Sequence, residues 1–152
     1  MKPQSLKALL GAVAAIGLMT SAAHAQELAA KPGKWESTTN MSMTLNVQGR
    51  TINVPGTGFT NSHCLKPDDA KFKASDLARE GCEVSNVTST ATSMKFDLKC
   101  DQGGAAMVGA MTFNMNSSRD SGEGTIAMSG SMPGQGAMAA SGTIKSKRIG
   151  DC

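Results

Sequence analysis

Side chains that could perform acid–base or nucleophilic catalysis are scarce in this chain of 152 residues. It contains no tyrosine and only two histidines, His24 and His63. A Ser-His-Asp triad would have to use His63, yet the sequence has no Gly-x-Ser-x-Gly elbow for its nucleophile. The glycine-rich stretches at 122–127 and 134–139 do not stand between a strand and a helix, as a dinucleotide site requires. We therefore predict that the protein is not an enzyme and has neither a catalytic residue nor a cofactor.

The chain also lacks a strong excess of charge of either sign. Once the first 25 residues are set aside, 13 basic residues face 12 acidic ones. A nucleic-acid-binding protein usually presents a basic patch or stripe. The basic run "KSKR" at 145–148 fits the solvated side of a strand instead, so we expect no nucleic-acid partner.

Long apolar runs are missing too, apart from one near the N-terminus. Residues 8–19 are apolar, follow Lys2 and Lys7, and precede Ala23-His24-Ala25, which is the order of a secretory signal peptide and its cleavage site. Two glycines interrupt this run, and it is shorter than the roughly 20 residues that a membrane-spanning helix needs. We predict a signal peptide at 1–25, a single exported β domain at 26–152, a periplasmic location, and no transmembrane segment after signal removal.

The four cysteines contain no Cys-x-x-Cys pair, which disfavours a zinc site and a thioredoxin-like redox pair. An even number of cysteines in an oxidising compartment indicates disulfides, and four cysteines allow three pairings. Cys82 and Cys100 are equidistant from a polar centre near Ala91 and so can face each other across a hairpin. This favours Cys82 with Cys100, which leaves Cys64 for the C-terminal Cys152.

Alternation of apolar and polar residues dominates the exported part. From Trp35 to Val47 the apolar side chains fall on odd-numbered positions, the period of a half-buried strand. The stretch "PGTG" at 55–58 is expected to interrupt the strand that returns beside this one. The same alternation then occupies most of the chain after residue 81.

These patterns predict a mostly β fold, with an antiparallel sheet of about seven or eight strands curled into a barrel or sandwich. One short helical segment is expected near 67–80, where β-branched residues are absent, Pro67 suits a first helical position and Gly81 can end the segment. Large core residues are few, with one tryptophan and four phenylalanines. A small domain with so modest a core usually needs disulfides.

Three motifs together give the chain a family resemblance. They are "PGKWE" at 32–36, "CLKPD" at 64–68 and "RIGDC" at 148–152, with the two inner cysteines between them. In this order and spacing they resemble a bacterial family of small exported proteins, domain of unknown function 3617. The resemblance covers nearly the whole exported part and implies a disulfide-bonded, mostly β domain. It supplies no catalytic or binding residues.

The methionines allow two interpretations. Thioethers favour Cu(I) or Ag(I), and Met41 and Met43 share a strand face with Trp35, so that these two and His63 form an alternative soft-metal site. Methionine is also an ordinary filler of irregular cores and of adaptable binding surfaces. A curled sheet with a methionine-lined interior can accept a small apolar ligand. We expect a non-enzymatic binding module for such a ligand or for an envelope partner; a metal-binding protein and an envelope structural protein are the alternatives.

Overall fold

The computed structural model describes residues 27–78, 80–134 and 136–152. The predicted signal peptide, 1–25, lies outside these residues. Seven long strands form one antiparallel sheet in the order β3-β2-β9-β8-β7-β6-β5. Their bounds are β2 Gly33–Val47, β3 Arg50–Leu65, β5 Cys82–Ser89, β6 Ser93–Gln102, β7 Ala105–Met115, β8 Ser121–Met132 and β9 Gly136–Gly150.

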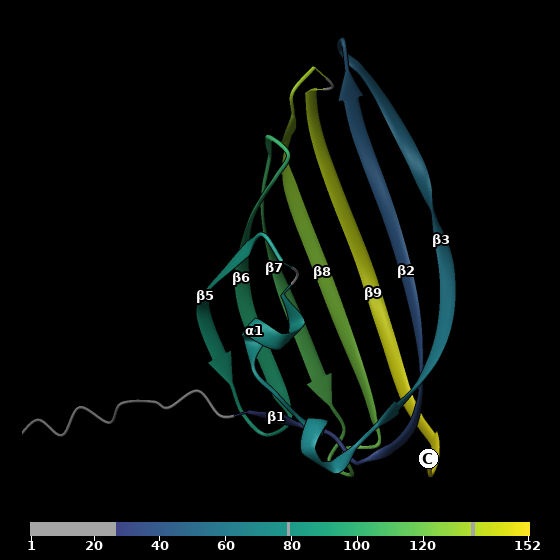
Figure 1. Ribbon diagram of the computed structural model, residues 1–152. Coiled ribbons are helices and arrows are strands. Elements are labelled where there is room, and N and C mark those ends of the chain that lie inside the picture. The colour runs from purple at the N-terminus through teal and green to yellow at the C-terminus, as the bar shows by residue number, and fades with distance from the viewer. Residues whose placement is uncertain (1–26, 79, 135) are drawn as a thin grey trace, which may run out of the picture.

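The sheet is strongly curled but open, because its two edge strands, β3 and β5, do not pair with each other (Figure 1). The prediction of a mostly β, antiparallel, curled sheet is therefore confirmed, and the sheet does not close into a barrel. Among the described residues no helix is long and apolar enough to cross a membrane.

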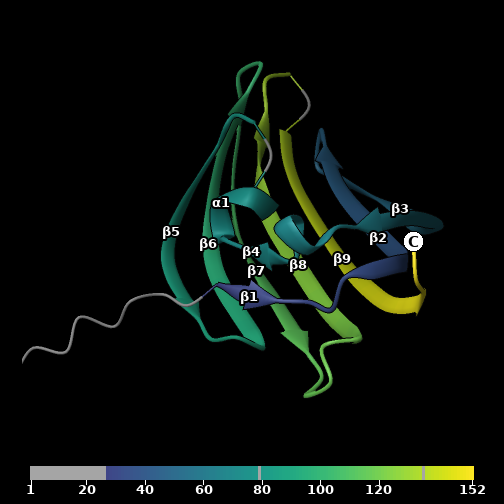
Figure 2. The same cartoon turned by 60° about the horizontal axis from the view of Figure 1, so that its bottom comes forward.

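A short segment crosses the concave side of the sheet. It contains the 3-10 turn η1 (Pro67–Asp69), β4 (Lys71–Phe72) and helix α1 (Ala74–Leu77), and β4 pairs with β1 (Leu28–Ala29). We call residues 66–78 the strap. Figure 2 shows the strap and β1 lying inside the curl, while Figure 1 shows that they cover only the lower part of the strands. The predicted helical segment thus consists of two separate turns with a short strand between them.

Two disulfides flank the strap. Cys64, at the end of β3, is joined to Cys152, and Cys82, at the start of β5, is joined to Cys100. This is the pairing that the hairpin argument favours. The Cα atoms are 5.7 Å apart in the first bond and 4.0 Å apart in the second. The strap is thereby tied to the C-terminus at one end and to β6 at the other.

Strand β3 runs without a break through "PGTG", so the predicted interruption there is wrong. The pairing with β2 shifts register between Met41 and Met43 instead, which is a β-bulge. A Cβ on Gly56 would lie 2.6 Å from the carbonyl oxygen of Met41, so glycine lets the two strands stay close. Pro55 is tolerated because an edge strand does not need every backbone N–H for pairing.

The three motifs at 32–36, 64–68 and 148–152 meet at one end of the sheet. Gly33 pairs with Leu65, and Lys34 pairs with Gly150. The indole Nε1 of Trp35 donates a hydrogen bond to the carbonyl oxygen of Lys31 at 2.9 Å. Arg148 donates from Nε to the carbonyl oxygen of Pro32 at 2.7 Å and forms an ion pair with Asp151. Short polar contacts therefore hold residues 31–35 and 148–151 together beside the outer disulfide.

Gly33 provides a test of this junction. Its φ is +140°, and a Cβ there would lie 2.5 Å from the carbonyl oxygen of Gly150 and in contact with the Arg148 guanidinium. Gly33→Ala is expected to lower the free energy of unfolding by about 3 kcal/mol or more, from backbone strain and displacement of both neighbours. Gly49→Ala, at φ +76° with nothing within 4 Å, is the matched control and should lose about 1 kcal/mol. Urea denaturation measures both, and equal losses would contradict the proposed role of the junction.

Candidate functional site

A cavity of about 220 Å³ lies between the strap and the concave face of the sheet. Three of its lining side chains, Leu28, Phe72 and Leu77, come from β1, β4 and α1. The sheet supplies the opposite wall, which is mostly apolar and includes Trp35, Leu65, Met111, Phe113, Met115 and Ile144. The cavity therefore exists because the strap covers part of the sheet without filling the space beneath it.

Glycines in β8 shape the floor of this cavity. Phe113 of β7 pairs with Gly124, and a Cβ at Gly124 would lie 2.6 Å from the phenylalanine ring. A Cβ at Gly122 would lie 2.8 Å from the same ring and 2.6 Å from the sulfur of Met115. Because both positions are glycine, Phe113 and Met115 can lie against the backbone of β8 instead of standing out from it.

Above the strap the concave face continues as an uncovered apolar surface, which we call the trough. Cross-strand pairing sets its residues in rows. From β3 towards β7, one row is Thr57, Met41, Gly142, Ile126 and Met111, the next is Val54, Met43, Ala140, Met128 and Gly109, and the third is Ile52, Leu45, Met138, Gly130 and Met107. Threonine is the single polar residue type in these rows.

The apolar side chains of this face are exposed mainly on β2 and β3, whereas Met111 and Met138 in the same rows are buried. Among the described residues seven large apolar side chains are exposed, and four of them lie on this face: Met41 at 37%, Val54 at 44%, Ile52 at 48% and Phe59 at 56%. Phe59 shares the face because it pairs with Thr39, which lies two positions from Met41. Scattered exposed apolar residues are common, whereas a contiguous group usually marks a binding surface.

The cavity also contains a small polar group. Ser37 of β2 pairs with Ser146 of β9, and their hydroxyl oxygens are 2.8 Å apart. His63 of β3 pairs with Trp35 and lines the same cavity, although it is exposed. The sequence pattern pointed to His63 as a candidate site residue but not to Ser37 or Ser146. The signal was available, because Ser37 is a polar residue in the apolar register between Trp35 and Met41.

The structure does not bring the proposed soft-metal ligands together. Met41 and Met43 both lie in the trough, but His63 lies opposite Trp35, six positions away along β2. At roughly 3.3 Å per residue this is about 20 Å, far beyond the reach of a shared ligand sphere. The thioether of Met41 lies against Gly142. Among the described residues no group of three or more His, Cys, Asp or Glu could hold a metal ion.

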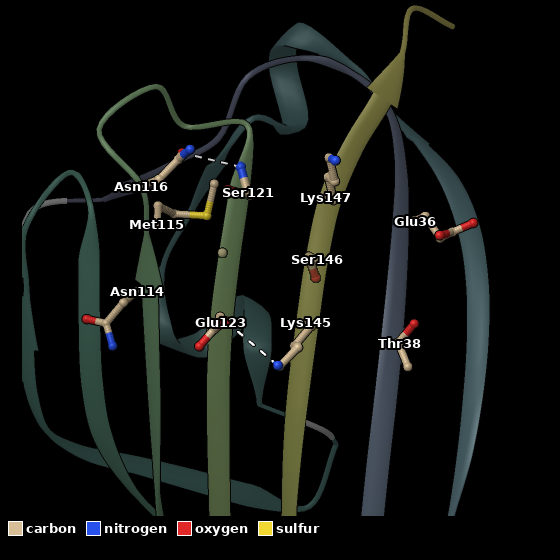
Figure 3. A pocket seen from close by; sticks show the side chains of 11 residues that line it. Glu36, Thr38, Asn114, Met115, Asn116, Ser121, Glu123, Lys145, Ser146 and Lys147 are labelled. Atoms are coloured by element: carbon tan, nitrogen blue, oxygen red, sulfur yellow. Dashed lines mark hydrogen bonds and ion pairs between the residues drawn. The ribbon is translucent and has the colours of Figure 1, made fainter.

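A second hollow, of about 540 Å³, lies largely on the convex side, and most of the side chains that line it are polar or charged. Figure 3 shows its side chains spread along separate strands rather than gathered around one point. Lys145 is 4.0 Å from Glu123, and Lys147 pairs across the strands with Glu36, so the positive charges of "KSKR" have acidic neighbours. This hollow is more open than the concave cavity and much less apolar, so the concave cavity with its trough is the better candidate site.

One comparison with known proteins gives a match. The model of a family described as "Protein of unknown function (DUF3617)" matches residues 30–152. No curated protein and no solved structure matches the chain.

The separation of Met41 and Met43 from His63 leads to a prediction about copper. Replacing both methionines by leucine should leave any Cu(I) binding unchanged and alter stability by less than about 1.5 kcal/mol each, because leucine keeps a similar volume. Competition with a Cu(I) indicator and a thermal melt, both with the disulfides oxidised, measure the two effects. Tight Cu(I) binding by the wild type that the double variant loses would favour the soft-metal interpretation instead.

Proposed function

We propose that this chain, which belongs to the DUF3617 family, is a non-enzymatic module that binds a small apolar ligand on the concave face of its sheet. The observation that supports this proposal is the continuity of a covered apolar cavity with an exposed apolar trough. Ligand sites are typically concave and mostly apolar, with a few polar groups that orient the ligand. The cavity has this composition, since Ser37, Ser146 and His63 are set among apolar side chains.

The exposed apolar side chains of the trough support the same proposal, because their contact with water is unfavourable. Exposed apolar surface costs about 25 cal/mol per Å² relative to burial, so covering Phe59, Ile52 and Val54 would stabilise the protein. A ligand that covers them gains this free energy upon binding. The methionines beside them are flexible and can adapt to ligands of different shape.

A neutral apolar dye tests the proposal. N-phenyl-1-naphthylamine should bind the wild type with an increase in its fluorescence. Met41→Glu places a charge in the trough and should weaken binding about ten-fold or more, because apolar contact does not compensate a desolvated carboxylate. Asn40→Glu is the matched control, since Asn40 is the neighbouring residue on the opposite face of β2 and is also exposed; it should bind as the wild type does. Absence of binding, or equal loss in both variants, would reject the proposal.

We also propose that the protein acts in the periplasm after loss of residues 1–25. The two disulfides support this location, because such bonds persist mainly in oxidising compartments. N-terminal sequencing of protein from the periplasmic fraction should then begin at Gln26. A full-length chain recovered from the cytosol or the inner membrane would argue against it.

A further inference from the structure

The cavity beneath the strap is almost entirely apolar, and its few polar side chains are grouped on neighbouring strands. Its polar side chains, Ser37, His63 and Ser146, come from the neighbouring strands β2, β3 and β9. Asn61 does not line the cavity, but it lies next to this group because it pairs with Ser37 across β2 and β3. The strap and β7 supply only apolar side chains to the cavity. A ligand that fits both sides must itself have a polar end and an apolar end.

The polar group retains capacity for hydrogen bonds. Ser37 and Ser146 bond to each other, which uses only one of their two hydroxyl hydrogens. Within the described part of the chain, the side chains of His63 and Asn61 make no hydrogen bond or ion pair. Because His63 and Asn61 lie on the edge strand β3 and are exposed, a polar ligand group bound here would stay in reach of water.

The volume of the cavity limits what part of a ligand it can hold. At about 220 Å³ it is smaller than the roughly 300–1,000 Å³ of a typical small-molecule pocket. Only one end of a ligand fits, and the remainder must leave through the open side. Met111 lines the cavity and belongs to the first row of the trough, and Ile144 lies next to that row, so the trough continues from the cavity.

The cavity and the trough together form one long surface along β2. From Ser37 in the cavity to Leu45 in the trough, this surface covers eight positions, about 26 Å at roughly 3.3 Å per residue. Gly142 of β9 lies near its middle, and the Met41 sulfur and Ile126 lie against this glycine from either side. An extended flexible chain matches this length better than a compact ring system.

Building on the apolar-ligand function proposed above, we infer that the ligand is a single-chain amphiphile. Its polar end lies against Ser37, Ser146 and His63, and its hydrocarbon chain runs along the trough towards Leu45. The polar end accepts one hydrogen bond from the hydroxyl group of Ser37 or Ser146 that is not donating to the other serine. It accepts a second hydrogen bond from the His63 ring. The chain covers the exposed apolar side chains of β2 and β3.

The single tryptophan reports the orientation of such a ligand directly, because Trp35 lines the cavity and pairs with His63. Bromine quenches tryptophan fluorescence on contact. We expect 2-bromododecanoic acid, which carries bromine beside its carboxylate, to quench Trp35 strongly. 12-bromododecanoic acid, which carries it at the far end, should bind with similar affinity and quench weakly. Stronger quenching by the 12-bromo compound would overturn the proposed orientation.

Substitutions test the polar contacts. His63→Ala combined with Ser146→Ala should weaken the binding of dodecanoic acid about ten-fold, which is the effect of losing roughly one or two hydrogen bonds. The same variant should bind the neutral dye as the wild type does. Ser62→Ala combined with Lys147→Ala, at neighbouring positions on the convex face, is the matched control and should bind both compounds normally. An unchanged affinity for dodecanoic acid in the first variant would overturn the assignment of the polar site.

Comparison of the dye with dodecanoic acid separates this inference from the proposed function. If the dye binds in the trough and dodecanoic acid does not displace it, the ligand class is wrong while the binding function stands. If neither compound binds, both are wrong. If dodecane displaces the dye as well as dodecanoic acid does, the polar end contributes nothing and the inference is wrong.

Discussion

The two disulfides at the ends of the strap are the constraint on which the rest of the structure depends. By loop-closure entropy, the bond across 88 residues destabilises the unfolded chain by about 4.5 kcal/mol and the bond across 18 residues by about 3 kcal/mol. These values are comparable with the whole stability of a small domain. This covalent restraint adds to the apolar contacts of Ala70, Phe72 and Leu77, so the strap can stay in place although a cavity remains beneath it.

The same restraint explains why so much apolar surface can stay uncovered. Among the described residues, the core is concentrated where the strap meets β6 and β7, at Phe96, Met94 and Leu28. The upper half of the concave face has no second layer, so Ile52 and Val54 remain exposed. Folding therefore leaves part of the apolar surface exposed to water, and a ligand can bury this surface when it binds.

Large and small residues lie side by side across the strands of the concave face, which lets neighbouring strands pack closely. Met41 lies beside Gly142, and Phe113 lies beside Gly124. In the sequence, these glycines stand at positions where the alternation would place an apolar side chain. Their partners could not be identified from it, because Met41 and Gly142 are about a hundred residues apart and meet only through the register of β2 and β9.

The local pattern of the sequence was sufficient to predict the strands, the antiparallel sheet and the short helical segment, since period-two alternation and helix-terminating residues act over a few positions. The spacing of Cys82 and Cys100 about a hairpin likewise favoured their pairing. Sequence did not indicate that β3 continues through Pro55, because a bulge depends on the partner strand. It also did not show that Ser37, His63 and Ser146 share one cavity or that Met41 and His63 are far apart. Only the tertiary structure decided these points, because side chains from distant segments converge or separate according to strand order, register and curl.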